Sequence, residues 1–142
     1  MTKNIKLLNQ SYAQTGSSTT MNDMGMREMQ ARAFAKRGSQ YLLIKSPPAS
    51  GKSRAMMFLA LDKLHHQKLK KVIVAVPEMS IGKSFKSTNL TQHGFFADWV
   101  VEDRYNLCLN NYQTDNSKTE IFSEFLRNSD PTANVLVCTH HS

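Results

Sequence analysis

The chain has 142 residues, of which 40% are hydrophobic and 20% are charged. This composition fits one soluble globular domain and excludes intrinsic disorder. The formal net charge of +7 suits a polyanionic partner such as a nucleic acid, although a solvated basic face would carry the same charge. No apolar run approaches the roughly 18 residues that a membrane span needs. The N-terminus lacks the pattern of a secretory signal, so we expect a cytoplasmic protein.

The first third of the chain predicts an arm, a helix and a strand. Residues 1–21 are polar and rich in Ser, Thr, Asn and Gln, which is typical of a flexible arm. A folded domain is expected over 22–142, and its first helix should begin near Asn22 and end near Gly38. The apolar run YLLIK, residues 41–45, predicts a short strand.

The rest of the chain alternates between helix and strand patterns. Residues 54–68 favour a buried helix, because apolar side chains surround its axis. The run VIVAV, 72–76, is apolar on both faces and predicts a strand covered on both sides. Ser117 and Glu120 form a capping box that opens another helix, and NVLVCT, 134–139, predicts the last strand. This order predicts an α/β fold with a parallel sheet and right-handed crossovers.

The tripeptide Gly-Lys-Ser occurs twice, in different surroundings. A phosphate-binding loop needs a buried strand before it, small residues, a lysine, a hydroxyl and an immediate helix start. The first copy, SPPASGKSR at 46–54, meets these conditions, although Ser46 stands where the usual pattern has glycine. In the second copy, VPEMSIGKS, the carboxylate of Glu78 would repel phosphate and the β-branched Ile81 opposes a tight turn. We therefore place the nucleotide site at the first copy; a plain surface turn is the alternative.

Four segments in this order resemble motifs of superfamily 2 helicases and translocases of the DEAD/DEAH-like type. They are GMREMQ, which ends at Gln30, then SPPASGKS, VIVAVPEMS and VLVCTHHS. The closest likeness is to proteins related to type I and type III restriction enzyme subunits, in which the first motif commonly begins with alanine or serine. The resemblance covers roughly residues 22–142. It implies the incomplete, N-terminal part of a RecA-like P-loop NTPase domain that binds ATP and Mg²⁺.

The resemblance also implies a role for each matching residue. Gln30 would recognise adenine, Lys52 would act as the catalytic lysine on the phosphates, and Ser53 would bind Mg²⁺. The backbone that would cradle the phosphates belongs to Ala49, Ser50, Gly51, Lys52, Ser53 and Arg54. A nucleic acid, with DNA favoured over RNA, would lie against Pro77, Glu78, Ser80, Lys83, Thr139 and His140. A solvated lysine at position 83 and an exposed polar residue at position 30 are the alternatives.

Two parts of the family pattern are missing from the sequence. There is no D-E-x-[DH] motif, which in the family holds Mg²⁺ and activates water, and there is no second RecA-like lobe with its arginine finger. Such enzymes stabilise the charge on the γ-phosphate from both lobes, so we expect little or no ATP hydrolysis by this chain alone. We interpret the chain as the N-terminal part of a longer protein or as the product of a truncated gene.

Two further functions remain open at this point. A small P-loop phosphotransferase, such as a nucleoside kinase, would need an arginine-rich lid, whereas Arg104 and Arg127 are isolated in the sequence. A non-catalytic nucleic-acid-binding fragment with a vestigial phosphate loop would keep the basic charge and lose the nucleotide.

Several other side chains are better explained by packing than by chemistry. Cys108 and Cys138 lie in apolar contexts without metal-like spacing, which predicts buried, reduced thiols. Adjacent histidines occur twice, also without zinc-ligand spacing. The aromatic residues around Trp99 favour a core cluster over base stacking, and a weak strand is expected at 99–101.

Overall fold

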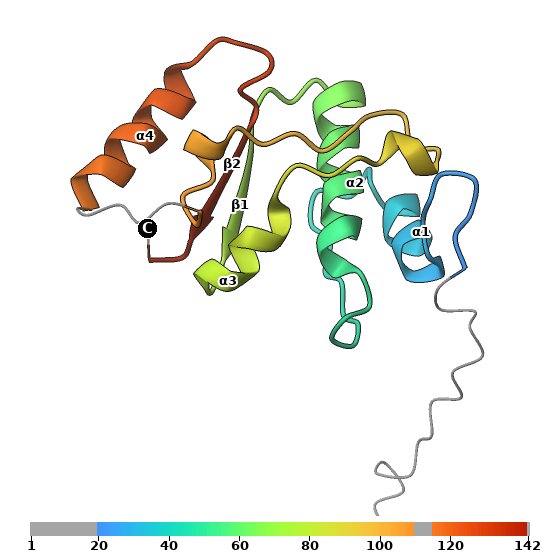
Figure 1. Ribbon diagram of the computed structural model, residues 1–142. Helices are drawn as coiled ribbons and strands as arrows, with labels where there is room; N and C mark the ends of the chain where they lie inside the picture. Colours follow the sequence, from blue (N-terminus) through green and yellow to red (C-terminus); the bar gives the residue numbers. More distant parts are fainter. Residues whose placement is uncertain (1–19, 110–114, 142) are drawn as a thin grey trace, which may run out of the picture.

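The computed structural model describes residues 20–109 and 115–141, so the predicted arm lies almost wholly outside the described residues. Figure 1 shows an architecture of mixed helices and strands. In chain order these are α1 (Glu28–Ala35), α2 (Lys52–His66), β1 (Val72–Val76), α3 (Met79–Gly82), α4 (Asp115–Arg127) and β2 (Val135–Thr139). Short 3-10 turns follow α3 at Lys83–Phe85, Thr91–His93 and Asp103–Tyr105.

The sheet of the described residues joins β1 and β2 in parallel. Val72 lies opposite Val135, and the pairing continues in register to Val76 opposite Thr139. Both strands and their parallel direction confirm the prediction, and the second strand begins one residue later than predicted. The other edge of β2 carries a short parallel bridge at Asn106, where the next N–H, that of Leu107, donates to the Val137 carbonyl at 2.8 Å. The sequence did not predict this bridge.

The two strands differ in how they are covered. Along β2, alternate residues face α2 and α4, so both of its faces are buried. Along β1, Val74 and Val76 face the core, whereas Ile73 is 45% exposed and Ala75 is also exposed. The prediction that residues 72–76 are covered on both sides is therefore wrong for one face. The physical reason is that α4 packs on β2 and leaves the neighbouring strand uncovered (Figure 1).

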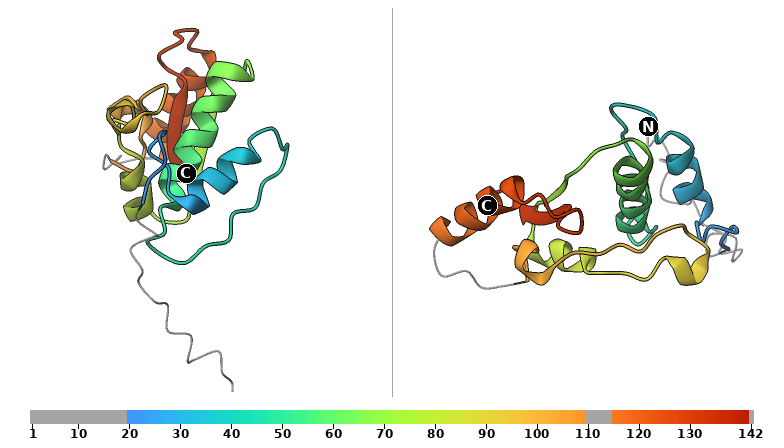
Figure 2. Two further views of the ribbon diagram at one scale, coloured as in Figure 1. Left: turned by 90° about the vertical axis from the view of Figure 1, so that its right-hand side faces the viewer. Right: turned by 90° about the horizontal axis from the view of Figure 1, so that it is seen from above.

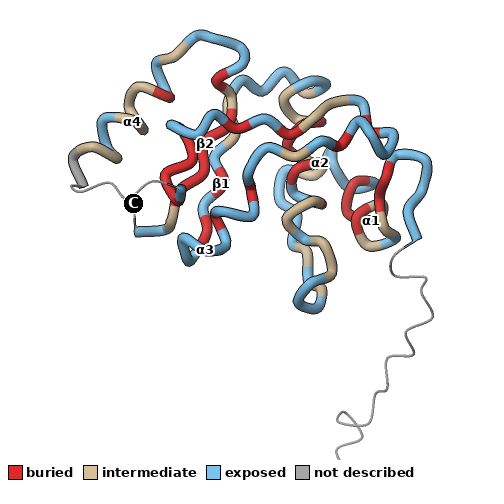
Figure 3. The backbone as a smooth tube through the Cα atoms, in the orientation of Figure 1, coloured by how far each residue is buried: buried red, intermediate tan, exposed pale blue. Residues whose placement is uncertain are grey.

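A hydrophobic core fills the space between α1, α2, β1 and the long connection after α3 (Figure 3). Phe58, Phe95 and Trp99 lie inside it, which confirms the core position predicted for Phe95 and Trp99. Phe96, expected with them, packs its ring against Phe95 but is 44% exposed. The indole N–H of Trp99 donates to the Phe85 carbonyl at 2.9 Å, so the ring is buried with its polar atom satisfied. A smaller cluster around Phe125 packs α4 against β2. The thiols of both cysteines are free and buried, as predicted.

The predicted strand at 41–45 does not form. Residues 39–50 run as an open connection from α1 to α2 (Figure 2), and Tyr41 and Leu43 are 87% and 91% exposed. The segment has the apolar composition of a strand, but no described part of the chain pairs with its backbone. A strand is defined by such pairing, and composition alone does not supply it. The phosphate-loop pattern therefore follows an extended segment here, not a paired strand.

The boundaries of other elements also differ from the prediction. The first helix begins six residues after Asn22, because the Asn22 side chain accepts the N–H groups of Met24 and Met26, both at 3.0 Å, and so holds a turn. The capping-box helix starts at Asp115, ahead of Ser117. The weak strand expected at 99–101 is reduced to one antiparallel bridge between Thr88 and Trp99.

Candidate nucleotide site and the neighbouring sheet edge

The loop before α2 is built around two left-handed residues. Ala49 has a φ of 59° and Gly51 a φ of 90°, and Gly51 is the N-cap residue of α2. Glycine adopts this conformation freely, whereas for alanine it costs about 1–2 kcal/mol. The helix starts at Lys52, directly after the glycine, as the sequence predicted. The first-turn amides of a 15-residue helix therefore lie next to the loop.

Lys52 and the serines close the loop on itself. The ammonium of Lys52 donates to the carbonyl of Ser46 at 2.9 Å. The hydroxyl of Ser46 lies 2.7 Å from that of Ser50. The residue at the position of the missing glycine thus takes part in two bonds across the loop. Sequence reasoning found the lysine but not this pair of hydroxyls, because a contact between loop residues has no periodic signal.

Gln30 joins α1 to the loop. Gln30 is the N3 residue of α1 and is 2% exposed. Its side-chain oxygen accepts the N–H of Arg27 at 2.8 Å. The same amide donates to the carbonyl of Gly51 at 3.0 Å, across 21 residues of sequence. The structure therefore brings the predicted adenine-recognition residue against the predicted phosphate loop. An exposed polar residue, the alternative, is excluded.

A cavity of about 410 Å³ opens at this junction. Its lining residues are Met21, Arg27, Gln30, Ala49, Gly51, Lys52, Ser53 and Arg54. Three of them carry a positive charge and one an amide, which is the donor set that a nucleotide would require. Arg27, which lies within the GMREMQ segment, belongs to this set. Among the described residues no cluster of three histidines, cysteines or carboxylates could hold a metal by itself, so Mg²⁺ would depend on phosphate oxygens, water and Ser53.

The second Gly-Lys-Ser copy has a different structure. Gly82 ends α3 with a helical φ of −59°, and it is buried. A Cβ added there would meet Cys108, whose own Cβ would lie 2.6 Å away. Ser84 donates to the carbonyl of Ile81 at 2.6 Å, as a residue inside a helical turn does. Here glycine allows α3 to pack closely, and the segment forms no phosphate loop.

The predicted nucleic-acid residues lie at the edge of the sheet that is formed by the carboxyl ends of both strands. Both strands end there, with Val76 opposite Thr139, and the N–H of His140 donates to the Val76 carbonyl at 2.9 Å. Pro77, Glu78, Ser80 and Lys83 belong to α3 and its flanks, which therefore lie beside Thr139 and His140. Figures 1 and 2 place this edge on the same side of the molecule as the start of α2.

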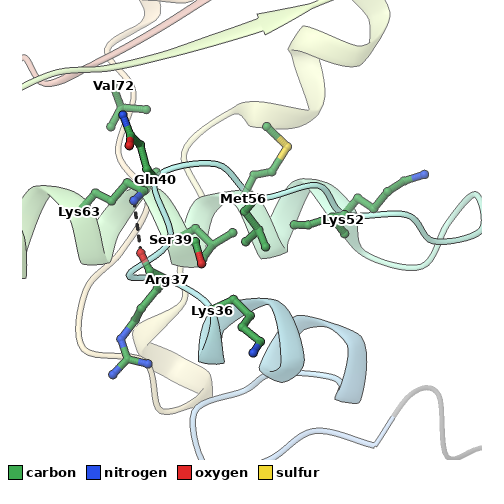
Figure 4. Close-up of a pocket in the computed structure, with 12 residues that line it drawn as sticks. Lys36, Arg37, Ser39, Gln40, Lys52, Met56, Lys63 and Val72 are labelled. Carbon is green, nitrogen blue, oxygen red and sulfur yellow. Dashed lines mark hydrogen bonds between the residues drawn. The ribbon is translucent and has the colours of Figure 1, made fainter.

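A second hollow lies on the other side of Lys52. We call it the α2 groove: a cavity of about 400 Å³ that is apolar in its walls and basic at its rim. The walls come from Leu42, Ile44, Met56, Leu59, Ala60 and Val72, and the rim includes Lys36, Arg37, Lys52 and Lys63. Figure 4 shows Lys63 reaching the backbone of Arg37, to which its ammonium donates at 3.2 Å. The groove runs between the unpaired 41–45 segment and the start of β1.

The fold and the loop define a class at a coarse level: a mixed α/β protein with a small parallel sheet and a helix that starts directly after a Gly-Lys-Ser turn. The chain is 60% identical over 129 residues to the "Putative ATP-dependent helicase YeeB" of Bacillus subtilis (strain 168). The alignment covers 91% of this chain and 20% of that relative, so the chain spans about a fifth of the relative's length. The chain is thus related to a helicase named for its dependence on ATP.

No family model matches the chain, and no solved structure gives a significant match. Across 20–109 and 115–141, no helix is long and apolar enough to cross a membrane.

Proposed function

We propose that this chain is the ATP-binding portion of a nucleic-acid-dependent ATPase of the superfamily 2 helicase or translocase type. The observation that carries the proposal is the bond from Gln30 to Gly51, which brings an amide, three cations and the start of α2 around one cavity. The helicase relative supports ATP as the nucleotide. The RecA-like P-loop fold and the restriction-related subfamily are part of the proposal.

The loop residues and Gln30 would each have a separate role in binding the nucleotide. The amides of residues 49–54 and the N-terminus of α2 would bind the phosphate oxygens. Lys52 would exchange the Ser46 carbonyl for a phosphate and so neutralise its charge. Ser53 would be the protein ligand of Mg²⁺, a cation that neutralises charge on the phosphates when bound. Gln30 retains one N–H and one acceptor lone pair beyond its two bonds, the pair of groups that one edge of adenine requires.

We expect the chain to bind ATP without efficient turnover. No Asp-Glu dipeptide occurs in its sequence, so the water-activating motif of the family has no counterpart. The loop residues supply binding and charge neutralisation, whereas the transition state also needs a positioned water and charges from the opposite side.

The test is calorimetric titration of ATP, with and without Mg²⁺, into the chain and two variants. Lys52→Ala should weaken Mg²⁺-dependent binding by about tenfold or more, the loss expected for a charged hydrogen bond. Lys83→Ala removes the lysine of the second Gly-Lys-Ser copy and should leave ATP affinity unchanged. Equal effects of the two substitutions, or no binding by a chain shown to be folded, would refute the proposed site.

The sheet edge around α3 would bind the backbone of a nucleic acid. Lys83 would contact a phosphate as a point charge, and DNA is favoured over RNA. Fluorescence anisotropy with single-stranded DNA and RNA of one sequence tests this. Here Lys83→Ala is the test variant and Lys52→Ala is the control. Lys83→Ala should weaken binding of either strand and reduce its salt dependence, because one phosphate contact is lost. Equal affinity of Lys83→Ala and the unaltered chain would make Lys83 a solvated surface residue.

A further inference from the structure

Ser46 makes a bond that a glycine at the same position could not make. Its hydroxyl and that of Ser50 lie 2.7 Å apart, so one donates to the other across the loop. Ser46 is only partly buried, and the pair joins the first residue of the loop to the residue before Gly51. The position at which this chain departs from the phosphate-loop pattern is therefore the one that closes the loop.

The backbone between the two serines needs a stabilising contact of this kind. Pro47 and Pro48 lack N–H groups, so neither can donate a backbone hydrogen bond to stabilise the turn. Ala49 follows in the left-handed conformation, which is unfavourable for a residue with a Cβ. The hydroxyl pair spans these three residues and offsets the tendency of the segment to open.

The bond from Lys52 to the Ser46 carbonyl cannot hold the loop closed in the nucleotide complex. Lys52 donates to the Ser46 carbonyl at 2.9 Å, but in the proposed function its ammonium moves to a phosphate. That bond is then lost, whereas the hydroxyl pair does not involve Lys52 and remains intact.

We infer that Ser46 is a positioning residue, whose hydroxyl acts through Ser50 to hold the amides of residues 49–54 in their binding arrangement while Lys52 changes partner. The part of this inference that concerns ATP rests on the proposed function. The part that concerns loop order rests on the Ser46–Ser50 pair and does not depend on ATP binding. Serine at position 46 thus replaces the flexibility of glycine with a hydrogen bond.

The experiment combines calorimetric titration of Mg²⁺–ATP with amide hydrogen exchange of the nucleotide-free chain. Ser46→Ala and Ser50→Ala should each raise the Kd about threefold to tenfold, the effect of one hydrogen bond. The double variant should be no weaker than either single variant, because the two substitutions remove the same bond. Ser46→Thr keeps the hydroxyl and should stay close to the unaltered chain. Thr132→Val removes a hydroxyl that donates to the Asp130 carboxylate at 2.8 Å, outside the loop, and serves as the matched control.

Hydrogen exchange provides a readout that general destabilisation would not give. The N–H of Ala55 donates to the Gly51 carbonyl at 3.1 Å, so it should exchange faster in both alanine variants, while protection in β2 and the thermal midpoint stay unchanged. Additive effects on the Kd, or unchanged exchange in Ser46→Ala, would overturn the inference. If the unaltered chain binds no ATP, the proposed function fails, and the exchange data alone then decide whether Ser46 positions the loop.

Discussion

Asp62, on α2, shows how one buried acidic residue is kept charged. Its side chain is 7% exposed and accepts hydrogen bonds from His66 at 2.9 Å and Gln67 at 2.8 Å, with Arg37 at 3.6 Å. Desolvation raises the pKa of Asp62, but the bonds from Gln67 and His66 and the charge of Arg37 together lower it below its ordinary value of 3.8. Since Arg37 follows α1, the network ties the two helices together.

We expect Asp62→Asn to lower the free energy of unfolding by about 1–3 kcal/mol at neutral pH, because a charged hydrogen-bond acceptor is lost from a buried network. The pKa of Asp62 is lower in the folded state than in the unfolded state. Its contribution is therefore complete above the unfolded pKa and is lost as the pH falls through the folded pKa. Urea denaturation from pH 7 down to pH 3 should show the difference between the two proteins shrinking below about pH 4.

The comparison with the variant is necessary because other carboxylates titrate in the same range. The pKa of Asp98 is lowered by the N–H of Thr91, and that of Asp130 by the N–H of Thr132. Both proteins share these contributions, so only the difference reports on Asp62. A difference that stays constant down to pH 3 would contradict the network as described.

At the scale of an element, α3 depends on the absence of a side chain at Gly82. The glycine packs against Cys108, and the buried amide of Asn106 donates to its carbonyl at 3.4 Å. The same amide oxygen accepts the N–H of Cys108 at 3.1 Å, so Asn106 connects α3 to the segment that bridges β2. The position of α3 beside the ends of both strands follows from this close contact.

Gly82→Ala should destabilise the protein by about 1–3 kcal/mol, because its Cβ would overlap Cys108 in a packed region. Gly38→Ala is the matched control, since nothing lies within 4 Å of a Cβ at that position. Chemical denaturation of both variants measures the effect, and DNA binding reports on the edge beside α3. If Gly82→Ala were as stable as Gly38→Ala, the close contact between Gly82 and Cys108 would not contribute to stability.

The elements also show how far the sequence could predict the fold. The strand at 72–76 was found residue for residue, because an uninterrupted β-branched run is a local signal. YLLIK has a similar composition but finds no partner, and pairing is a tertiary event that composition does not encode. The bridge at Asn106 was missed because a polar residue in a short, irregular stretch gives no strand signal.

The site divides in the same way. The start of α2 follows from a local pattern of small residues, glycine and helix formers, and it was predicted. The position of Gln30 beside the loop was reached through resemblance alone, since 21 residues separate it from Gly51. The Ser46–Ser50 pair was not predicted, because it depends on the turn that Ala49 makes.

At the scale of the whole molecule, apolar surface remains open around β1. Among the described residues β1 pairs only with β2. Val72, at the start of β1, lines the α2 groove, and Leu43 lies between the groove residues Leu42 and Ile44 and is 91% exposed. Unpaired edges and apolar grooves favour association between copies. The net charge of +7 opposes it, and salt screens this repulsion.

We therefore expect the molecular mass measured by light scattering to rise with protein concentration, and to rise more steeply at 0.5 M than at 0.05 M salt. Leu43→Asp should reduce this rise. Leu126→Asp, which changes an equally apolar but distant exposed residue on α4, should affect it less. A monomer at all concentrations, with a sharp and reversible melt, would show that the open edge does not drive association.

The register of the sheet also sets an order of events during synthesis. Val72 pairs with Val135, about sixty positions further along the chain. At typical translation rates of roughly 5–20 residues per second, β1 waits about 3–12 s before its partner has been made. The contacts between α1, the first loop and α2, such as the bond from Gln30 to Gly51, need no residue beyond α2 and can form in that interval. The loop and α2 can thus take shape on the ribosome well before the sheet that later supports them.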